Sequence, residues 1–293
     1  MKTLEKNVIN LFGQKGKIWL NSLPATIDKL SESWSLTNIQ PMNNMSWNYV
    51  ATAIQHNKMA VVLKISCDKQ IVLDEYKALK YFNGDGIIQV LDYNSEHNAI
   101  LLEQAIPGTA LKSLHPTKIT ETINIYVDLV NKISIKPLPR DDHYKHVNEW
   151  LKAIDRITDN RVEKRFIDKA CELRSRILNT AKHEYVCHGD LHLENIIKHG
   201  SNWLAIDAKG IIGEKAFEAA AFDLISKEEI KENKQISSLL FERIALLSNS
   251  LKIDKERLLA WVFLRIIMSA QWFIEDNGNP DDMLILAHYL YPL

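Results

Sequence analysis

The sequence has few cysteines, almost no net charge and no uninterrupted apolar segment of membrane-spanning length. Its three cysteines, Cys67, Cys171 and Cys187, stand far apart and form no Cys-x-x-Cys pair. This argues against a disulfide framework or a thiolate metal site and favours a reducing compartment, so we expect a cytoplasmic protein. The formal net charge of -1 gives no global electrostatic case for nucleic acid or an anionic membrane as a partner.

Two segments are candidates for a targeting or membrane sequence, and neither meets the requirements. The N-terminus carries charges throughout and lacks the apolar core of a signal peptide, so we interpret it as an amphipathic helix. The most apolar stretch, Leu258 to Ile274, is interrupted by Arg265 and Gln271. It falls short of the roughly 20 apolar residues that a membrane span needs. This stretch is typical of a buried helix.

Length and composition indicate a globular chain with more than one core. The 293 residues are 46% hydrophobic and 25% charged, so two domains or one bilobal unit are expected. The sequence says little about oligomeric state, and we expect a monomer or a weak dimer.

The N-terminal third begins with helical patterns and continues with strands. Residues up to about Trp34 are predicted to be helical, with Pro24 near the start of a second helix. Five strands follow, and one helix, Asp68–Phe82, comes after the third of them. The strands are predicted at Trp34–Gln40, Ser46–Ile54, Met59–Ile65, Ile87–Asn94 and Asn98–Ala105.

The pattern becomes mainly helical after Pro107 and Gly108. We therefore predict an α+β fold with an N-terminal lobe at 1–105, built on an antiparallel sheet with one main helix, and a mainly helical lobe at 106–293. The first long helices of the second lobe are predicted at Lys118–Ser134, Tyr144–Ile157 and Arg161–Lys182.

A short segment, CHGDLHLENII, gathers the residues on which the functional interpretation depends. It holds Asp190 and Asn195, and the segment LAIDAKG adds Asp207. Two short apolar runs lie on either side of the turn composition HGSN, which predicts a hairpin with Asn195 and Asp207 at its open end. An amide oxygen and a carboxylate there suit Mg²⁺. Asp190 lies just before the hairpin, placed to accept a proton from a hydroxyl.

These three residues have the order of a phosphoryl-transfer site. Protein kinases use H-R-D-x-x-x-x-N followed by D-F-G, and the spacing from Asp190 to Asn195 matches that template. The interval to Asp207 leaves room for one hairpin. We therefore predict Asp190 as the catalytic base, with Asn195 and Asp207 as ligands of Mg²⁺ on a bound nucleotide.

The nucleotide site of such a kinase also needs a lysine on a strand and a glutamate on the next helix. Lys64 lies in the strand pattern VVLKI, and Glu75 lies on the helix that follows. The pair would hold the α- and β-phosphates of ATP. Adenine would bond to backbone groups near Glu103 and Ala105 in the connection LLEQAIPG.

The residues above resemble the aminoglycoside phosphotransferase family, closest to its streptomycin 6-kinase and hydroxyurea phosphotransferase branch. The resemblance extends from about Trp34 to the C-terminus and rests on CHGDLHLENII, LAIDAKGIIGEKAFEAAAFDL, LLEQAIPGTAL and VLKI followed by EYKALKYFNGDG. It implies a protein-kinase-like bilobal fold and ATP-dependent phosphorylation of a hydroxyl of an aminoglycoside, most specifically streptomycin, which would inactivate the antibiotic. It also implies that Asp223 bonds the backbone of the His188–Asp190 loop.

The sequence departs from a protein kinase in several places. Gly189 stands where those enzymes carry arginine, and almost no chain separates Asp207 from the next helical pattern, so no activation loop is expected. Ala208 replaces the aromatic residue of D-F-G. The segment PMNNMSW has no glycine, and the backbone amides of Asn43 to Ser46 would have to cover the phosphates.

Alternative interpretations stay open. The same chemistry could act on another small hydroxyl compound of the sugar, choline or homoserine type, or the chain could be a non-catalytic nucleotide-binding module. His188 and His192 could bind zinc in a hydrolase, although HGDLH lacks the HExxH pattern. A polycationic acceptor needs acidic side chains nearby, and these could equally be solvated loop residues. The candidates are Asp141, Asp142, Glu275, Asp276, Asp281 and Asp282.

Overall fold

The computed structural model describes residues 1–43, 45–56, 58–134, 136–139, 144–181, 183–232 and 235–292. The chain divides into two compact units. Unit 1 comprises Met1–Gly108 with Lys198–Ile206, and unit 2 comprises Thr109–Ile197 with Asp207–Leu293. The assignment of nucleotide binding to a lobe at 1–105 and of catalysis to a lobe at 106–293 stays a prediction. The compact units differ from them mainly because the segment 198–206 packs with unit 1.

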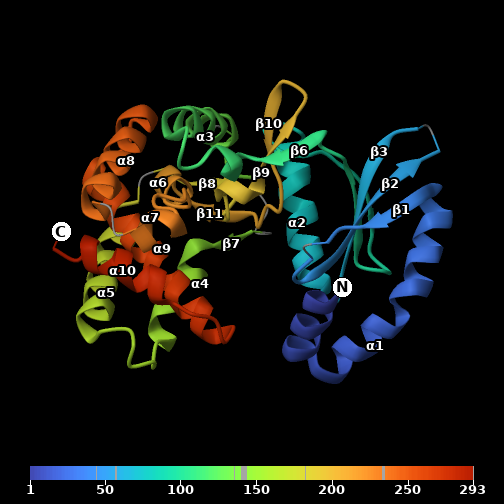
Figure 1. The fold of residues 1–293 in the computed structure, drawn as a ribbon, viewed down its shortest axis with the longest axis horizontal. Coiled ribbons are helices and arrows are strands. Elements are labelled where there is room, and N and C mark those ends of the chain that lie inside the picture. Colours follow the sequence, from blue (N-terminus) through green and yellow to red (C-terminus); the bar gives the residue numbers. More distant parts are fainter. Residues whose placement is uncertain are drawn as a thin grey trace. The chain divides into compact units, whose positions relative to one another are not determined.

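Unit 1 is built on a five-stranded antiparallel sheet in the order β1-β2-β3-β5-β4 (Figure 1). All five predicted strands are present, and the second pairs with the third in a register that places Ile54 opposite Ala60. The strands run over β1 Leu36–Pro41, β2 Asn48–Gln55, β3 Ala60–Ser66, β4 Val90–Asn94 and β5 Ala99–Glu103.

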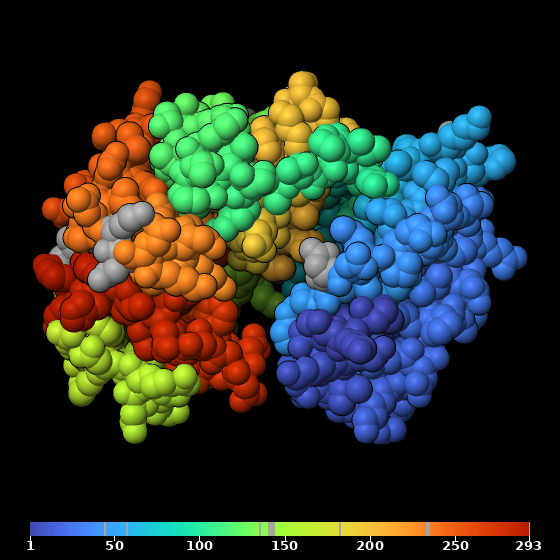
Figure 2. All heavy atoms as spheres, viewed as in Figure 1, coloured from blue at the N-terminus to red at the C-terminus, as the bar shows by residue number. Residues whose placement is uncertain are grey.

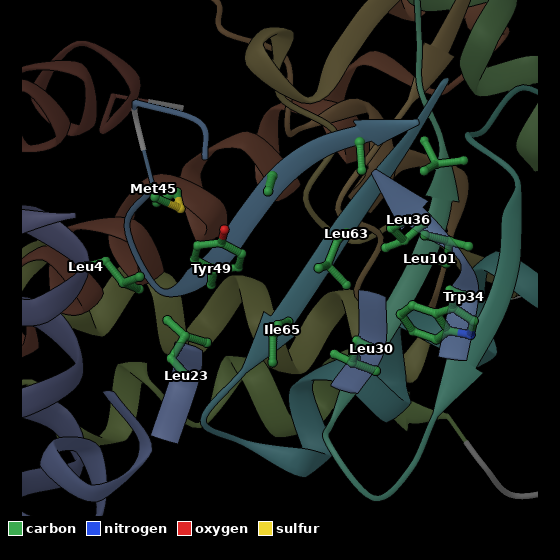
Figure 3. Close-up of a cluster of buried hydrophobic side chains, with 14 of the residues drawn as sticks. Leu4, Leu23, Leu30, Trp34, Leu36, Met45, Tyr49, Leu63, Ile65 and Leu101 are labelled. Atoms are coloured by element: carbon green, nitrogen blue, oxygen red, sulfur yellow. The ribbon is translucent and has the colours of Figure 1, made fainter. Parts of the chain in front are cut away.

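Alternation along β3 directs its side chains to two different helices. Leu63 and Ile65 are fully buried in a cluster with residues of α1 (Lys2–Trp34), including Leu23 (Figure 3). Lys64 points to the other face, toward α2 (Lys69–Phe82). Since successive side chains of a strand lie on opposite faces, the apolar face packs on α1 while the other face presents the lysine.

The N-terminal helical region differs from the prediction in where it breaks. The only non-helical backbone inside α1 is at Gly13, with φ 53°, whereas Pro24 lies inside the helix that follows. Gly13 accommodates this positive φ because it has no Cβ. The prediction of a second helix starting near Pro24 was therefore wrong. The outer face of α1 lies at the surface of unit 1 (Figure 2), where Leu11 and Ile18 are exposed.

The helix α2 has clear signals at both ends. The side chain of Asp68 accepts a hydrogen bond from the backbone N–H of Gln70 at 2.8 Å, and Asn83 closes the helix in a left-handed conformation. Its buried face carries Val72 and Leu79 together with Glu75. The cap and the helical spacing thus set which face Glu75 occupies.

Unit 2 is mainly helical, and α9 (Lys255–Glu275) is its central helix. Thirteen residues of α9 are buried, so the stretch predicted to be a buried helix is one. Among the described residues, α9 alone is long and apolar enough to cross a membrane, and 72% of its most apolar window is buried inside the protein. This burial is what a helix at the centre of a folded unit shows. The predicted helices near 118–134 and 161–182 are also present, as α3 (Ile119–Ile133) and α5 (Lys164–Asn179).

The helix predicted at Tyr144–Ile157 is wrong in its first part and interrupted later. Residues Lys145–His146 form the short strand β7, which pairs in parallel with Ile211–Gly213 (β11). The ring of His146 then accepts a hydrogen bond from Asn148 N and starts α4 (Val147–Leu151). Strand pairing, a tertiary interaction, overrides the helical pattern at this point.

Two three-stranded sheets, in the orders β10-β9-β6 and β7-β11-β8, were not predicted as sheets. The hairpin predicted after Asn195 is present as β9 and β10, which are neighbours in the first of them. The remaining elements are β6 Pro107–Ala110, η1 Leu111–Leu114, η2 Ile154–Arg156, β8 Tyr185–Cys187, η3 Leu193–Asn195, β9 Ile196–His199, β10 Asn202–Ala205, α6 Lys215–Ala219, α7 Lys227–Glu232, α8 Ile236–Leu251 and α10 Asp281–Leu290.

Candidate active site

The segments that carry Asp190 and Asp207 run side by side in unit 2. Strand β8 leads into Asp190, strand β11 follows Asp207, and the two strands pair antiparallel with Cys187 opposite Ile211. The backbone N–H of Lys209 also donates to the carbonyl of His188 at 2.8 Å. Since the end of one antiparallel strand lies opposite the start of its partner, the chain segments that carry the two aspartates lie at the same end of this strand pair.

The turn before Asp190 depends on Gly189. Its φ is +88°, a left-handed conformation that side chains disfavour. A Cβ there would lie 3.0 Å from Ile211 Cγ1 and 3.3 Å from Lys209 Cβ. Glycine therefore allows the loop His188–Asp190 to lie closely against the segment that follows Asp207.

Asn195 is bonded directly to the loop of Asp190. Its side-chain Nδ2 donates to the carbonyl oxygen of Asp190 at 2.9 Å, and the residue is 8% exposed. Because only the amide nitrogen can donate to a carbonyl, this bond fixes the orientation of the side chain. The amide oxygen Oδ1 is thereby directed away from the loop, and it is the atom that can act as a ligand.

Asp207 completes the set of oxygen-bearing side chains. It is partly buried and has φ +63°, a conformation uncommon for residues other than glycine that recurs at functional sites. Asn195 directly precedes β9 and Asp207 follows β10, so the hairpin separates them in sequence. A carboxylate together with an oriented amide oxygen fits a hard divalent cation such as Mg²⁺.

The carboxylate of Asp190 is 33% exposed and lies among cations. Burial alone would raise its pKa, but Arg265, Lys209 and His192 outweigh that effect and hold the pKa below its usual value. Asp190 is therefore ionised at neutral pH and can accept a hydrogen bond or a proton. Arg265, which donates to Asp190 Oδ1 at 3.1 Å, was not singled out as a site residue by the sequence analysis.

The loop His188–Asp190 is supported by Glu218 and not by Asp223. The Glu218 carboxylate accepts from the backbone N–H of His188 and, at 3.2 Å, from that of Gly189. Asp223 instead accepts from Leu193 N at 2.8 Å, one turn further along. The role expected for Asp223 in the His188–Asp190 loop was therefore assigned to the wrong acid.

The two histidines of the motif have structural contacts. His188 is fully buried, and its Nδ1 accepts from Asp190 N at 3.2 Å. The ring of His192 accepts from Glu194 N at 3.3 Å. Across the described ranges, no group of three or more His, Cys, Asp or Glu side chains is placed to hold a metal ion. This finding gives no support to the zinc-hydrolase alternative.

In unit 1, Lys64 and Glu75 form a buried ion pair. Lys64 Nζ lies 2.7 Å from Glu75 Oε2 and 2.9 Å from Oε1, and both side chains are 5% exposed. Two predicted nucleotide-binding residues are thus in contact. A buried lysine held this way is a fixed positive charge.

The connection after β5 contains the buried residue Ala105, which is 7% exposed. Among the described residues, no partner bonds its backbone N–H. The next N–H, of Ile106, donates to His199 Nδ1 at 3.1 Å, and Glu103 Oε1 accepts from Gln89 N at 2.7 Å. Because buried N–H groups are nearly always bonded, Ala105 fits a residue that donates to a ligand such as adenine.

The segment predicted to cover the phosphates and the acids proposed for the acceptor are described only in part by the structure. In the segment PMNNMSW, Met45 is buried and its sulfur accepts from Val50 N at 3.1 Å, while Asn44 lies outside the described residues. Of the acids proposed for the acceptor, Asp141 and Asp142 also lie outside them. Glu275 forms a two-bond ion pair with Arg156.

Comparison with known proteins identifies the family of this chain. The family model for aminoglycoside/hydroxyurea antibiotic resistance kinases matches residues 34–277. Streptomycin 6-kinase of Streptomyces griseus is 24% identical over 272 residues, covering 90% of this chain and 87% of that protein.

Two solved structures share the protein-kinase-like fold. Choline kinase from Streptococcus pneumoniae superposes with a TM-score of 0.65 at 15% identity, covering 93% of this chain and 99% of that one. A thermostable mutant of the aminoglycoside phosphotransferase APH(4)-Ia, in a ternary complex with ADP and hygromycin B, gives 0.64 at 13%, covering 90% and 95%. Since the family model spans well over half of the sequence, the chain belongs to the aminoglycoside/hydroxyurea antibiotic resistance kinases.

Proposed function

We propose that this protein transfers the γ-phosphoryl group of ATP to a hydroxyl of an aminoglycoside, with streptomycin as the first candidate, and so inactivates the antibiotic. The observation that carries the proposal is the bond between Asn195 Nδ2 and the Asp190 carbonyl, beside an ionised Asp190 carboxylate. It ties a potential metal ligand to a potential base within one short loop. The family and the streptomycin 6-kinase relative support this chemistry.

Asp190 is the group that receives the acceptor. Its carboxylate accepts a hydrogen bond from the reacting hydroxyl, orients the oxygen for attack on the γ-phosphorus, and takes the proton as the new O–P bond forms and the bond to the β-phosphate oxygen breaks. The transition state of such transfers is loose, so positioning and electrostatic stabilisation supply most of the rate.

Asn195 Oδ1 and the carboxylate of Asp207 would hold Mg²⁺. When bound, this ion neutralises charge on the phosphates and orients them. The amide of Asn195 is held in place by its bond to the Asp190 carbonyl, so its oxygen needs no reorientation before binding. Asp207 supplies the full negative charge of the pair.

In this proposal, residues of unit 1 bind the α- and β-phosphates and the adenine of ATP. Lys64, braced by Glu75, would neutralise the α- and β-phosphates. The unpaired N–H of Ala105 and the backbone near Glu103 would bond adenine. Related structures with bound ADP or AMP-PNP support the choice of an adenine nucleotide.

The test is an acceptor panel. Purified protein is incubated with ATP and Mg²⁺ and with streptomycin, hygromycin B, hydroxyurea, choline, homoserine and simple sugars, and ADP release and phosphorylated product are both measured. We expect the highest kcat/KM with streptomycin. A far higher value for one of the metabolites would move the function to that acceptor class.

Hydroxyurea is the second candidate, because the family description names it and a hydroxyurea phosphotransferase from Kitasatospora aureofaciens is 22% identical over 274 residues. ATP binding without transfer to any acceptor would favour a non-catalytic module instead.

The three cysteines are free, which supports the proposed location in a reducing cytoplasm. A monomer or weak dimer remains our proposal for the oligomeric state, to be measured by analytical ultracentrifugation.

A further inference from the structure

One charged side chain lies among the buried residues of α9, the long helix of unit 2. Arg265 is in the middle of α9 and is 9% exposed. Apart from Gln271, every other buried residue of α9 is apolar. A guanidinium in such a place is costly unless it is paired and hydrogen-bonded, so its partners indicate its role.

Two hydrogen bonds of the Arg265 guanidinium go to the loop that carries the proposed base. Nη1 donates to the carbonyl oxygen of Gly189 at 2.9 Å, and Nη2 donates to Asp190 Oδ1 at 3.1 Å. The guanidinium also lies over the ring of Phe217, 5.6 Å from its centroid. One rigid, planar group therefore binds the backbone just before Asp190 and one oxygen of its carboxylate together.

The same loop is also held by Glu218. This fully buried carboxylate accepts from the backbone N–H groups of His188 and Gly189. Glu218 of α6 thus accepts from two N–H groups of the loop, and Arg265 of α9 donates to one of its carbonyl oxygens. Because helices hold their side chains more rigidly than loops do, these two helices fix the backbone of the loop.

We propose that Arg265 is a positioning residue that fixes the direction of the Asp190 carboxylate. With Oδ1 bound to Arg265, the other oxygen, Oδ2, is left for the acceptor hydroxyl, and His192 Nε2 lies 3.9 Å from it. The proposal rests on the proposed function only in that Asp190 receives the hydroxyl. Arg265 itself touches neither acceptor nor nucleotide in this assignment.

The geometry distinguishes arginine from lysine at this position. The two bonds need two donors held in one plane, which a guanidinium provides and an ammonium does not. Arg265→Lys keeps the positive charge but loses one of the two bonds, so the carboxylate can rotate. We expect kcat to fall by about 10²-fold, as for a misplaced reacting group, with little change in the KM for ATP.

A matched control separates positioning from loss of stability. Arg243 is also a buried arginine of unit 2, 5% exposed, and its guanidinium binds Glu229 and the carbonyl of Leu224. Arg243→Lys should lower the midpoint of thermal unfolding without lowering kcat in the folded fraction. If Arg265→Lys behaves in the same way, Arg265 is structural and the proposal is overturned.

A double-mutant cycle tests whether Arg265 acts through Asp190. The loss of kcat caused by Arg265→Lys is measured in the parent and in the Asp190→Asn background. We expect the roughly 10²-fold loss to shrink to less than about threefold when Asp190 is already replaced. An equal loss in both backgrounds would contradict the proposal.

Crystal structures of the parent and of Arg265→Lys give a readout that needs no acceptor. We expect one orientation of the Asp190 carboxylate in the parent and a turned or divided orientation in the variant. An unchanged carboxylate would overturn the proposal even if the enzyme phosphorylates streptomycin. Conversely, the parent protein could phosphorylate no acceptor while the Asp190 carboxylate still loses its fixed orientation in Arg265→Lys. That result would reject only the proposed function. If Arg265→Lys does not fold, Arg265→Gln is carried through the same measurements.

Discussion

Lys64 Nζ on β3 lies 2.7 Å from Glu75 Oε2 on α2, with both side chains 5% exposed. The alternation of β3 places Lys64 on the face opposite Leu63 and Ile65, and the helical spacing of α2 places Glu75 on its buried face. Two local periodicities thus produce one long-range ion pair. In the proposed function, Lys64 of this pair is a positive charge already in place for the phosphates of ATP.

Glu75→Ala should destabilise the protein and weaken ATP binding, because it removes a carboxylate that lies 2.7 Å from the buried ammonium group of Lys64. Removing one partner of a buried pair costs about 3–5 kcal/mol. Urea unfolding and the KM for ATP measure the two effects. The control is Asp168→Ala, which removes the exposed partner of Lys164 and should change neither quantity measurably. Equal effects of the two substitutions would contradict a special role for the Lys64–Glu75 pair.

Asn195→Ala should raise the Mg²⁺ concentration needed for half-maximal activity. It removes the oxygen Oδ1 proposed as a ligand and also the bond from Nδ2 to the Asp190 carbonyl. Loss of groups that only support a metal ligand lowers metal affinity by about 10- to 100-fold, so at least this shift is expected. The measurement is a Mg²⁺ titration of the initial rate at fixed ATP. A titration curve that superposes on that of the parent would remove Asn195 from the metal site.

Gly189→Ala should reduce both stability and kcat. The new Cβ meets Ile211 and Lys209 at a residue with φ +88°. Gly200→Ala is the matched control, since Gly200 also has a positive φ, +54°, but nothing lies within 4 Å of its Cβ position. Each alanine carries a conformational cost of about 1–2 kcal/mol, whereas only Gly189→Ala should displace Asp190. Equal kcat values for the two variants would show that the close packing at Gly189 does not position the base.

Glu218 should make stability depend on pH near neutrality. Burial raises the pKa of this carboxyl to about 7, although hydrogen bonds from His188 and Gly189 and the charge of Arg265 act to lower it. Between about pH 4.5 and 7 the folded protein holds a proton that the unfolded chain has released. The free energy of unfolding therefore falls as pH rises through this window and levels off above it.

The variant Glu218→Gln cannot ionise, so it should lack this decline, which amounts to about 3 kcal/mol at most. Urea unfolding of parent and variant from pH 4.5 to 8 measures the difference. Glu229→Gln, compared with the parent by the same method from pH 4.5 down to about 2, gives a contrast of opposite sign. Burial would raise the pKa of Glu229, but Arg243 and the backbone of Ser226 hold it at about 2, so its stabilisation is lost as pH falls from 4.5. Parallel curves for the parent and Glu218→Gln would show that Glu218 does not titrate in this range.

Local patterns were sufficient to predict much of the fold and to propose most residues of the candidate site. The strands of unit 1 follow from alternation and turn residues, and the hairpin β9–β10 follows from two apolar runs around HGSN. The order of Asp190, Asn195 and Asp207 is itself a sequence feature. These predictions depend on residues close together in the chain.

What the sequence could not supply depends on contacts between distant residues. The strand β7 forms because β11, 66 positions later in the chain, pairs with it (Ile211 with Lys145). Glu218 and Asp223 are both acids after Asp207, and only the packing of α6 shows that Glu218 binds the His188–Asp190 loop. Arg265 is 75 residues from Asp190. Its one sequence signal was a charge inside an apolar helix.

The central claim is that the Asp190 carboxylate receives the acceptor hydroxyl, and steady-state phosphorylation of streptomycin by Asp190→Asn tests it most directly. The substitution keeps the shape of the side chain and removes its ability to take a proton. The account predicts a fall in kcat of about 10²- to 10⁴-fold, with the KM for ATP nearly unchanged. A variant that turns over as fast as the parent would contradict the account.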